Sequence, residues 1–546
     1  MEPVAITAAA GTFPGAPTLE AYWERIAAAR PAPLGSLEER WGLPRAAYYS
    51  PDPSAVDRTY LDQAFCLEGF ETAPSEDRQE ALAASVLARL VAQRPSLARE
   101  RAGLVLATNY PGQSYFRADA ARYLAPFMEA PLSAEAPPSS PERLLQSLAE
   151  GIGFGGPRLG VDTACSSSLY ALDLALGLLR TGQADAVAVC GLTGYLPLFL
   201  FVGFSRLHAF SSEGQIRPFA SDASGILLGE GCGAVLLQAE ASDPLALIRG
   251  LGLSSDGSDR SVFAPAALGQ RLAYERAYVG LDPAETDYVE AHGTATSVGD
   301  ATELATLDGF FGPHRTTPLP IGSVKGLIGH QLANAGMAAL LKGILMLREE
   351  ILPPHLAVEP HPQIATTCCT LARAATPWRS SARPRRLGVS AFGFGGSNAH
   401  LVLEEAPLAR GRTSRVSSPP AESIVISDLE FACGTALDTA SWRAHLEADA
   451  LPQSAYSPER FGLFRDEAGA PALGAFFPPR FALETRGLRM GPKLLARLDP
   501  FQLLLTQLTQ RLLARHEALA GSPETGIAIL TNVGGALALQ SYRRFT

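Results

Sequence analysis

Apolar runs alternate with amphipathic stretches along most of the chain. Runs with few polar residues, such as VAIT at Val4, GLVLAT (103–108) and ADAVAVCG (184–191), predict buried strands. Residues 18–29 instead space their apolar positions as an amphipathic helix does. Continuous apolar strands separated by helices are typical of a mostly parallel sheet that is covered on both faces. The pattern therefore predicts an α/β protein.

Other apolar segments refine this picture. The runs GCGAVLLQ (231–238) and LALIRGLGLSS (245–255) resemble two strands paired with each other. The helix that follows Cys165 is apolar on nearly every face and is expected to end near Gly182. A similar all-apolar helix follows His330. Such helices must be buried, which predicts a large core.

One uncharged stretch, residues 186–205, is long enough to span a bilayer. It contains Gly191, Gly194 and Pro197, which divide it into a strand, a turn and a second apolar segment. We therefore expect no membrane insertion.

The periodicity disappears in residues 406–423, where Arg, Ser and Pro concentrate, and this segment is interpreted as a linker. The sequence that follows, IVISDLEFACGTALDTASW from Ile424, resembles VAITAAAGTFPGAPTLEAYW from Val4. GIAILTN (526–532) likewise resembles GLVLATN (103–109), at nearly the same spacing. Residues 424–546 are therefore predicted to be a partial repeat of the N-terminal part.

Composition narrows the class of protein. The formal net charge of −10 argues against a nucleic-acid-binding surface. Seven cysteines without a CxxC pair fit reduced thiols better than a disulfide framework or a zinc site, and we expect no metal. The start MEPVAITAAAG has no basic region typical of a signal peptide, so the expected location is the cytoplasm.

Cys165 stands where a predicted strand (158–164) meets the apolar helix. A helix N-terminus directs partial positive charge and free N–H groups at such a side chain. This environment favours a lowered thiol pKa and can hold an oxyanion. A buried, inert cysteine is the alternative, and this segment alone leaves both open.

Two histidines lie at similar junctions. DYVEAHGTATSVGDATEL (287–304) predicts a strand, His292, a small-residue loop and a helix that is capped by Asp300, with Glu303 three residues later. LPIGSVKGLIGHQLANAG (319–336) predicts a strand, Lys325, a glycine-rich turn and His330. Either histidine alone is more often structural, but three such junctions together indicate an active site.

A glycine-rich segment, GVSAFGFGGSNAHLVLEE (388–405), contains GxGxxN. A dinucleotide-binding fingerprint opens a helix, whereas these glycines lead into the strand HLVLEE. A loop whose backbone N–H groups approach a reacting carbonyl is the better interpretation.

These motifs resemble the β-ketoacyl synthase family. VDTACSSS, EAHGTAT, GSVKGLIGH and SAFGFGGSNAH stand in the family's order, with SSEGQIRPFASDASGILLGEGCGAVLL (211–237) between the first two. The resemblance covers about residues 1–405 and implies a thiolase-like fold. This fold has five layers, α-β-α-β-α, built from two similar halves (about 1–240 and 241–405), and is usually a homodimer.

The resemblance also implies roles. Cys165 would accept an acyl chain from a carrier-protein thioester. His292 and His330 would bind the malonyl thioester carbonyl and assist decarboxylation, with Lys325 orienting that side of the site. The N–H groups of Cys165 and Phe394 would form the oxyanion hole, and Phe394 would gate the site. Further substrate-binding residues would be Thr294, Thr296, Phe392, Gly395 and Gly396. The implied activity is a decarboxylating Claisen condensation in polyketide or fatty-acid assembly, with no cofactor except phosphopantetheine on the acyl carrier protein.

Some features depart from the family or leave alternatives open. Ala295 replaces the glycine usual in HGTGT, and no acyltransferase GHSxG or carrier-attachment motif is present. The partial repeat resembles the start of a second synthase or of a chain-length-factor-like partner, which would allow a heterodimer. A scaffold-type synthase-like partner and a non-decarboxylating thiolase-like transferase are the competing functions. The thiolase reading is disfavoured because Cys368 and Cys369 lie outside any matching glycine motif.

Overall fold

The computed structural model describes most of the chain to residue 406 and short segments beyond it. The described residues are 2–41, 43–70, 77–109, 141–239, 241, 243–257, 264–379, 383–406, 428, 438–448, 454–455, 473–474 and 500–516. Those up to 406 belong to one compact unit, and those from 428 onward belong to a second. All of the predicted linker (406–423) except Ala406, and most of the predicted partial repeat (424–546), lie outside the described residues, so these boundaries stay predictions.

The first half of the main sheet contains five strands in the order β5-β4-β6-β7-β1. β4 is parallel to both β5 and β6, whereas β6 with β7 and β7 with β1 are antiparallel. The bounds are β1 (Val4–Thr12), β4 (Ala102–Thr108), β5 (Arg158–Val161), β6 (Ala186–Thr193) and β7 (Gly231–Gln238).

The second half repeats this arrangement. Its order is β10-β9-β14-β15-β8, with the same sequence of parallel and antiparallel pairs, and β12 is added at its edge. β1 and β8 pair across the junction of the halves. The bounds are β8 (Ala246–Ser255), β9 (Tyr288–Glu290), β10 (Leu319–Gly322), β12 (Cys369–Leu371), β14 (Arg386–Gly393) and β15 (Ser397–Glu404). The two similar halves predicted from the sequence are confirmed.

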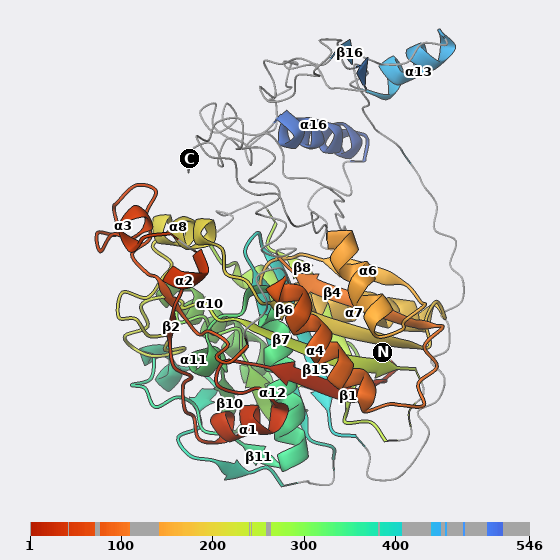
Figure 1. The fold of residues 1–546 in the computed structure, drawn as a ribbon. Coiled ribbons are helices and arrows are strands. Elements are labelled where there is room, and N and C mark those ends of the chain that lie inside the picture. Colours follow the sequence, from red (N-terminus) through yellow and green to blue (C-terminus); the bar gives the residue numbers. More distant parts are fainter. Residues whose placement is uncertain are drawn as a thin grey trace. The chain divides into compact units, whose positions relative to one another are not determined.

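Alternating side chains on each strand explain the layers. Leu104 and Leu106 of β4 pack with α4 (Arg78–Ala92) and α6 (Pro141–Gly151) on the outer face, whereas Val105 and Ala107 face the central core. That core contains α7 (Ser167–Arg180) and α12 (Ala335–Glu349) and is closed on its other side by the second half of the sheet. The outer face of this second half is covered by α9 (Ala267–Ala277) and α10 (Ser297–Phe311), which gives five layers, α-β-α-β-α (Figure 1).

The helices and small strands complete the first unit. The helices are α1 (Leu19–Ala27), α2 (Glu38–Trp41), α3 (Arg45–Tyr48), α4 (Arg78–Ala92), α6 (Pro141–Gly151), α7 (Ser167–Arg180), α8 (Leu198–Arg206), α9 (Ala267–Ala277), α10 (Ser297–Phe311), α11 (Lys325–Ile328) and α12 (Ala335–Glu349). The 3₁₀ turns are η2 (Pro283–Glu285), η3 (Gly312–His314), η4 (Leu332–Asn334) and η5 (Pro362–Thr366). The small sheets pair β2 (Gly35–Ser36) with β3 (Gln63–Ala64), and β11 (Ile351–Leu352) with β13 (Thr376–Pro377).

Two strand predictions were wrong. β7 and β8 do not pair with each other, because β1 lies between them and pairs with both. The sheet is not mostly parallel either, since β6, β7, β1, β8, β15 and β14 form a continuous antiparallel centre. Hydrophobic runs report burial on both faces but carry no information on strand direction.

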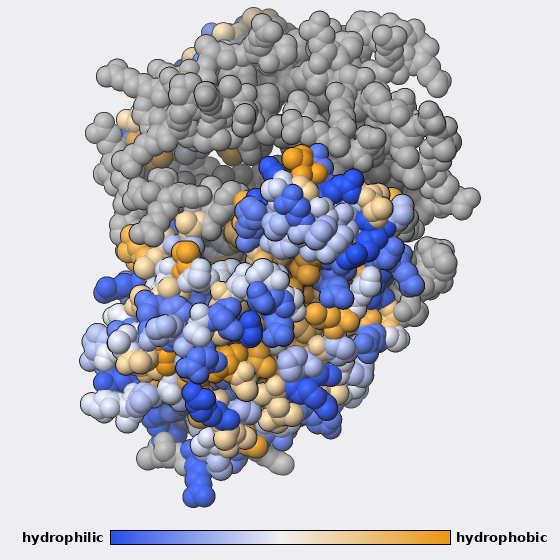
Figure 2. Space-filling model, turned by 90° about the vertical axis from the view of Figure 1, so that its left-hand side faces the viewer, coloured by the Kyte–Doolittle hydropathy of each residue, from blue (hydrophilic) through white to orange (hydrophobic). Residues whose placement is uncertain are grey.

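The uncharged stretch 186–205 folds as predicted, as strand β6 followed by the short helix α8. No helix among the described residues combines the length and apolar character that crossing a membrane requires. Hydrophilic side chains cover much of one face of the first unit, with smaller hydrophobic patches between them (Figure 2).

In the second unit, the described elements are α13 (Thr439–Glu447), β16 (Ser454–Ala455), β17 (Leu473–Gly474) and α16 (Pro500–Arg515). Arg515 and His516, at the end of α16, both contact the carboxylate of Asp428.

Candidate active site

The predicted site residues meet at one cavity of about 430 Å³ in the first unit. Eight of them line it: Cys165, Thr294, Thr296, His292, His330, Phe392, Phe394 and Gly396. Lys325 and Gly395 do not line the cavity. Lys325 contacts the backbone of His292, which does, and Gly395 stands between the lining residues Phe394 and Gly396. The described cysteines Cys368 and Cys369 are absent from its lining, so the second cysteine that a thiolase-type base would require is not among the described lining residues.

Cys165 occupies a tight turn between β5 and α7. Ala164 adopts a φ of +53°, the left-handed region that costs about 1–2 kcal/mol for a residue with a Cβ. The serines that follow hold this turn: Ser166 Oγ donates to the Thr163 carbonyl at 2.8 Å and Ser167 Oγ to the Ala164 carbonyl at 2.6 Å. The polar residues after Cys165 thus fix the direction of its side chain, a role that the sequence analysis missed.

Burial dominates the acidity of the Cys165 thiol. Only 4% of the residue is exposed, and this burial raises the pKa of the thiol to about 11. The charge of Lys325 and the N–H groups of Phe394 and Cys165 itself oppose the rise without overcoming it. The expectation that this junction lowers the thiol pKa is therefore corrected, because desolvation outweighs the nearby positive charge.

His292 follows β9, and two carboxylates of α10 hold its loop. Glu303 accepts the N–H groups of His292 and Gly293, both at 2.7 Å. Asp300 accepts the N–H of Ala295 at 3.1 Å, and burial raises the pKa of each carboxyl to about 7. The prediction that Asp300 caps this helix was wrong, because α10 begins at Ser297 and its N-cap is Thr296.

The backbone conformation of Ala295 explains why glycine is usual at this position of the HGTGT motif. Its φ is +60°, in the left-handed region, and its side chain is fully buried. The substitution is therefore accommodated at a steric cost of about 1–2 kcal/mol.

Hydrogen bonds assign the same tautomer to both histidines. The Phe392 N–H donates to His292 Nδ1 at 3.3 Å, and the Leu332 N–H donates to His330 Nδ1 at 3.0 Å. Burial and the charge of Lys325 lower the pKa of both imidazoles well below its usual value, so both are neutral near pH 7. Each neutral ring then carries its proton on Nε2. The ring centroids lie 5.6 Å apart, which gives the cavity two imidazole N–H donors.

Lys325 anchors the His292 loop. Its Nζ donates to the His292 carbonyl at 2.5 Å, and the residue is 3% exposed. Burial lowers the pKa of this ammonium, while the carboxylates of Glu290 and Glu303 oppose the shift. Lys325 therefore acts on the histidine through the backbone and through its charge.

A buried ion pair that the sequence analysis missed links the two histidine segments. Glu290, the last residue of β9, accepts from Lys342 Nζ of α12 at 2.5 Å and from Tyr288 Oη at 2.7 Å. Its other oxygen accepts the Val324 N–H at 2.6 Å, directly before Lys325. The signal in the sequence is a single lysine within the otherwise uncharged run AGMAALLKGILML (335–347).

Replacing Lys342 by methionine will destabilise the first unit by about 3–5 kcal/mol, because the buried carboxylate of Glu290 would lose its ion-pair partner. Urea unfolding at pH 7 measures the loss. The double variant Glu290→Gln/Lys342→Met removes both charges and should recover most of it. A loss below about 1 kcal/mol in the single variant would contradict the buried pair.

The glycine loop approaches the cysteine turn closely. A Cβ on Gly393 would lie 2.4 Å from the Thr163 carbonyl oxygen, which no real contact allows. Gly395 has φ +98° and open space around its Cβ position. Phe394 between them is 40% exposed, and its ring lies 5.6 Å from that of Phe204.

Gly393→Ala should slow acylation of Cys165 roughly 10- to 100-fold, because the loop or the cysteine turn must shift. Gly395→Ala is the matched control: it meets no atom, so it should cost about 1–2 kcal/mol of stability and leave acylation within a few-fold. Stopped-flow acylation and thermal melting distinguish the two effects. Wild-type acylation in Gly393→Ala would refute the close approach.

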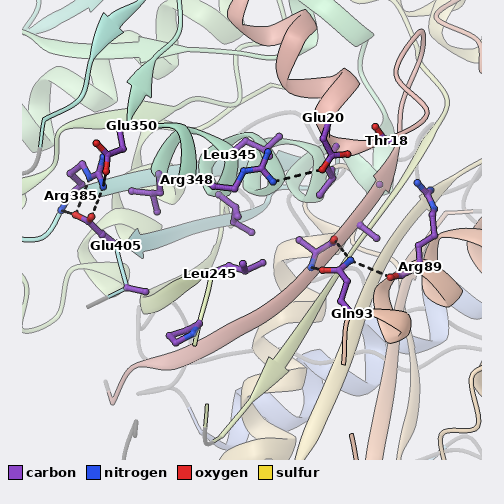
Figure 3. A pocket seen from close by; sticks show the side chains of 18 residues that line it. Thr18, Glu20, Arg89, Gln93, Leu245, Leu345, Arg348, Glu350, Arg385 and Glu405 are labelled. Carbon is purple, nitrogen blue, oxygen red and sulfur yellow. Dashed lines mark hydrogen bonds and ion pairs between the residues drawn. The ribbon is translucent and has the colours of Figure 1, made fainter. Parts of the chain in front are cut away.

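A larger cavity, of about 570 Å³, shares none of these lining residues. Ion pairs cross it or line it, Arg348 with Glu20 and Arg385 with both Glu350 and Glu405 (Figure 3). It holds no cysteine or histidine, so the smaller cavity is the candidate active site.

Comparisons with known families agree with the geometry. The family described as "Beta-ketoacyl synthase, N-terminal domain" matches residues 1–242, and "Beta-ketoacyl synthase, C-terminal domain" matches residues 245–359. The spectinabilin polyketide synthase system protein NorC of Streptomyces orinoci is 35% identical over 74% of this chain and 19% of its own length. Pks15/1 of Mycobacterium marinum, a phenolphthiocerol synthesis type I polyketide synthase, is 33% identical over 83% of this chain and 22% of its own. The chain thus spans about a fifth of the length of these relatives.

Solved structures show the same fold. The oxazolomycin ketosynthase domain OzmH KS7 of Streptomyces albus JA3453 is 29% identical, with a TM-score of 0.66 over 82% of this chain and 80% of that chain. The PfaC keto synthase–chain length factor is 25% identical, with a TM-score of 0.71 over 84% of this chain and 54% of that chain.

Proposed function

The chain belongs to the β-ketoacyl synthase family, and from that premise we propose that it condenses an acyl thioester with a malonyl thioester in polyketide assembly. One observation carries the proposal: Cys165 and two neutral imidazoles, each with its proton on Nε2, line one cavity. A nucleophile and a pair of uncharged donors are what a condensation through an enolate requires.

In the first step, Cys165 Sγ attacks the acyl thioester carbonyl. The thiol proton leaves with the carrier's sulfur, so an acyl-cysteine and a free carrier thiol are formed. The N–H groups of Phe394 and Cys165 already act on this sulfur and are suited to hold the oxyanion that forms on the attacked carbonyl.

In the second step, the carboxylate of the malonyl thioester leaves as carbon dioxide. The electron pair passes into an enolate, whose oxygen receives hydrogen bonds from Nε2 of His292 and His330. Neutral donors suit this step, because the reaction needs no base to form the carbanion. The carbanion attacks the acyl-cysteine, the new C–C bond replaces the C–S bond, and Cys165 takes up a proton.

Lys325, Thr294 and Thr296 fit positioning and binding roles. Lys325 holds the His292 carbonyl, and the hydroxyls of Thr294 and Thr296, 3.3 Å apart, line the cavity for the phosphopantetheine arm. The carrier brings that arm, so we propose no cofactor resident in the chain, an acyl carrier protein as partner, and the cytoplasm as the location. A homodimer or a heterodimer with a synthase-like partner remains part of this proposal.

The product tests the proposal. The chain, an acyl carrier thioester and a malonyl carrier thioester should together give a 3-oxoacyl thioester two carbons longer, with release of carbon dioxide. A scaffold-type protein would give no acyl-enzyme, and a thiolase-like transferase would condense acetyl units without malonyl.

We further propose that residues 424–546 begin a second synthase-like unit. The matched spacing of two segments with the N-terminus supports this, as does the similarity to a keto synthase–chain length factor structure.

A further inference from the structure

One polar side chain of the cavity has no role in this chemistry. Gln270, in the first turns of α9, lines the same cavity as Cys165 and is 2% exposed. Its side-chain oxygen is buried and has no hydrogen-bond partner in the described part of the chain. Buried acceptors are rarely left in this state, because water is lost without replacement.

Two donors near the start of α9 are committed elsewhere. Asn398, which also lines the cavity, directs its side-chain amide to the Asp256 carboxylate at 2.7 Å and to the Gly396 carbonyl at 3.3 Å. The Ser254 hydroxyl donates to the Gly269 carbonyl, next to Gln270. A Cβ on Gly269 would collide with Asp256 and Asn398, so the start of α9 is held against this pair.

We propose that Gln270 accepts a hydrogen bond from a hydroxyl group on the acyl chain carried by Cys165. The inference rests on the proposed function, which places that chain in the cavity. A carboxamide oxygen only accepts, so its partner must carry an O–H or N–H. Condensation leaves an oxo group on C3, which cannot donate, whereas its reduced form, a 3-hydroxyacyl chain, can. The preferred substrate class is therefore the 3-hydroxyacyl thioester.

An amide N–H of the phosphopantetheine arm is a second donor that the Gln270 oxygen can accept. Two matched substrates on one carrier distinguish the two donors, because butanoyl and 3-hydroxybutanoyl thioesters differ only in the acyl hydroxyl. We expect Gln270→Leu to lower kcat/KM for acylation by the 3-hydroxybutanoyl thioester about tenfold, because one hydrogen bond is lost. The kcat/KM for the butanoyl thioester should stay unchanged. Equal losses for both substrates would assign the contact to the arm and overturn the proposal, as would no loss for either.

The variant should fold, because leucine replaces a buried oxygen that has no partner. Its melting temperature is expected to equal or exceed that of the wild type. Gln363→Leu is the matched control: Gln363 also has a buried side-chain oxygen without a partner among the described residues, but it does not line the cavity. It should leave both acylation rates unchanged. Failure of the wild type to accept either substrate would instead count against the proposed function.

Discussion

Cys165→Ala will abolish the gain of one acyl group that intact-mass analysis detects after incubation with an acyl carrier thioester. Condensation should fall by about 10⁴-fold or more, because Cys165 is the only thiol among the described residues that line the cavity. Cys66→Ala is a matched control, since Cys66 is also buried with its pKa raised to about 11 and lies outside the cavity. It should acylate normally. An adduct that persists in Cys165→Ala would disprove the assigned nucleophile.

The raised pKa gives the same residue a pH signature. Below a pKa of about 11, the thiolate fraction of Cys165 rises tenfold with each pH unit. Alkylation of the wild type by iodoacetamide at Cys165, followed by peptide mass analysis, should accelerate in proportion between pH 6 and 9. A rate that levels off near pH 7 would instead indicate the lowered pKa expected from the sequence.

His292→Ala and His330→Ala will separate the two steps. Each variant should slow condensation by about 10²–10³-fold, the usual effect of removing one donor from a developing oxyanion. Acylation of Cys165 needs neither donor and should stay within about tenfold of the wild type. Single-turnover acylation and carbon dioxide release measure the two steps separately.

The control for these variants is His355→Asn. His355 is another buried, neutral imidazole, with its pKa lowered to about 4, and it does not line the cavity. This change should leave condensation intact at a temperature where the variant is folded. An equal loss of acylation and condensation in the His292 and His330 variants would refute their separate role.

Sequence patterns identified segments that meet in the fold, because strand-to-helix junctions are local features. The segments around Cys165, His292 and His330 each combine an apolar strand, small residues and a helix, and the fold brings all three to one cavity. The resemblance to a known family added the roles, which spacing alone left open.

The contacts between distant segments could not be predicted. Nothing around Glu290 indicates that Lys342, some fifty residues later, would be its partner. The acidity of Cys165 was misjudged for a related reason, since the desolvation that dominates it depends on how completely other segments cover the sulfur. The order β7-β1-β8 was also missed, because the first strand of the chain inserts between two later ones.

That insertion has a consequence for biosynthesis. While the chain emerges from the ribosome, β1 can pair with β7 as soon as the first half is complete, but its other edge stays open until β8 appears. The apolar helix α7 likewise remains uncovered until α12 is made. A nascent chain arrested after β7 but before β8 and α12 would expose both an unpaired strand edge and the apolar helix α7. Such surfaces promote aggregation. We therefore expect the half-synthesised protein, rather than the finished one, to be the form that depends on chaperones.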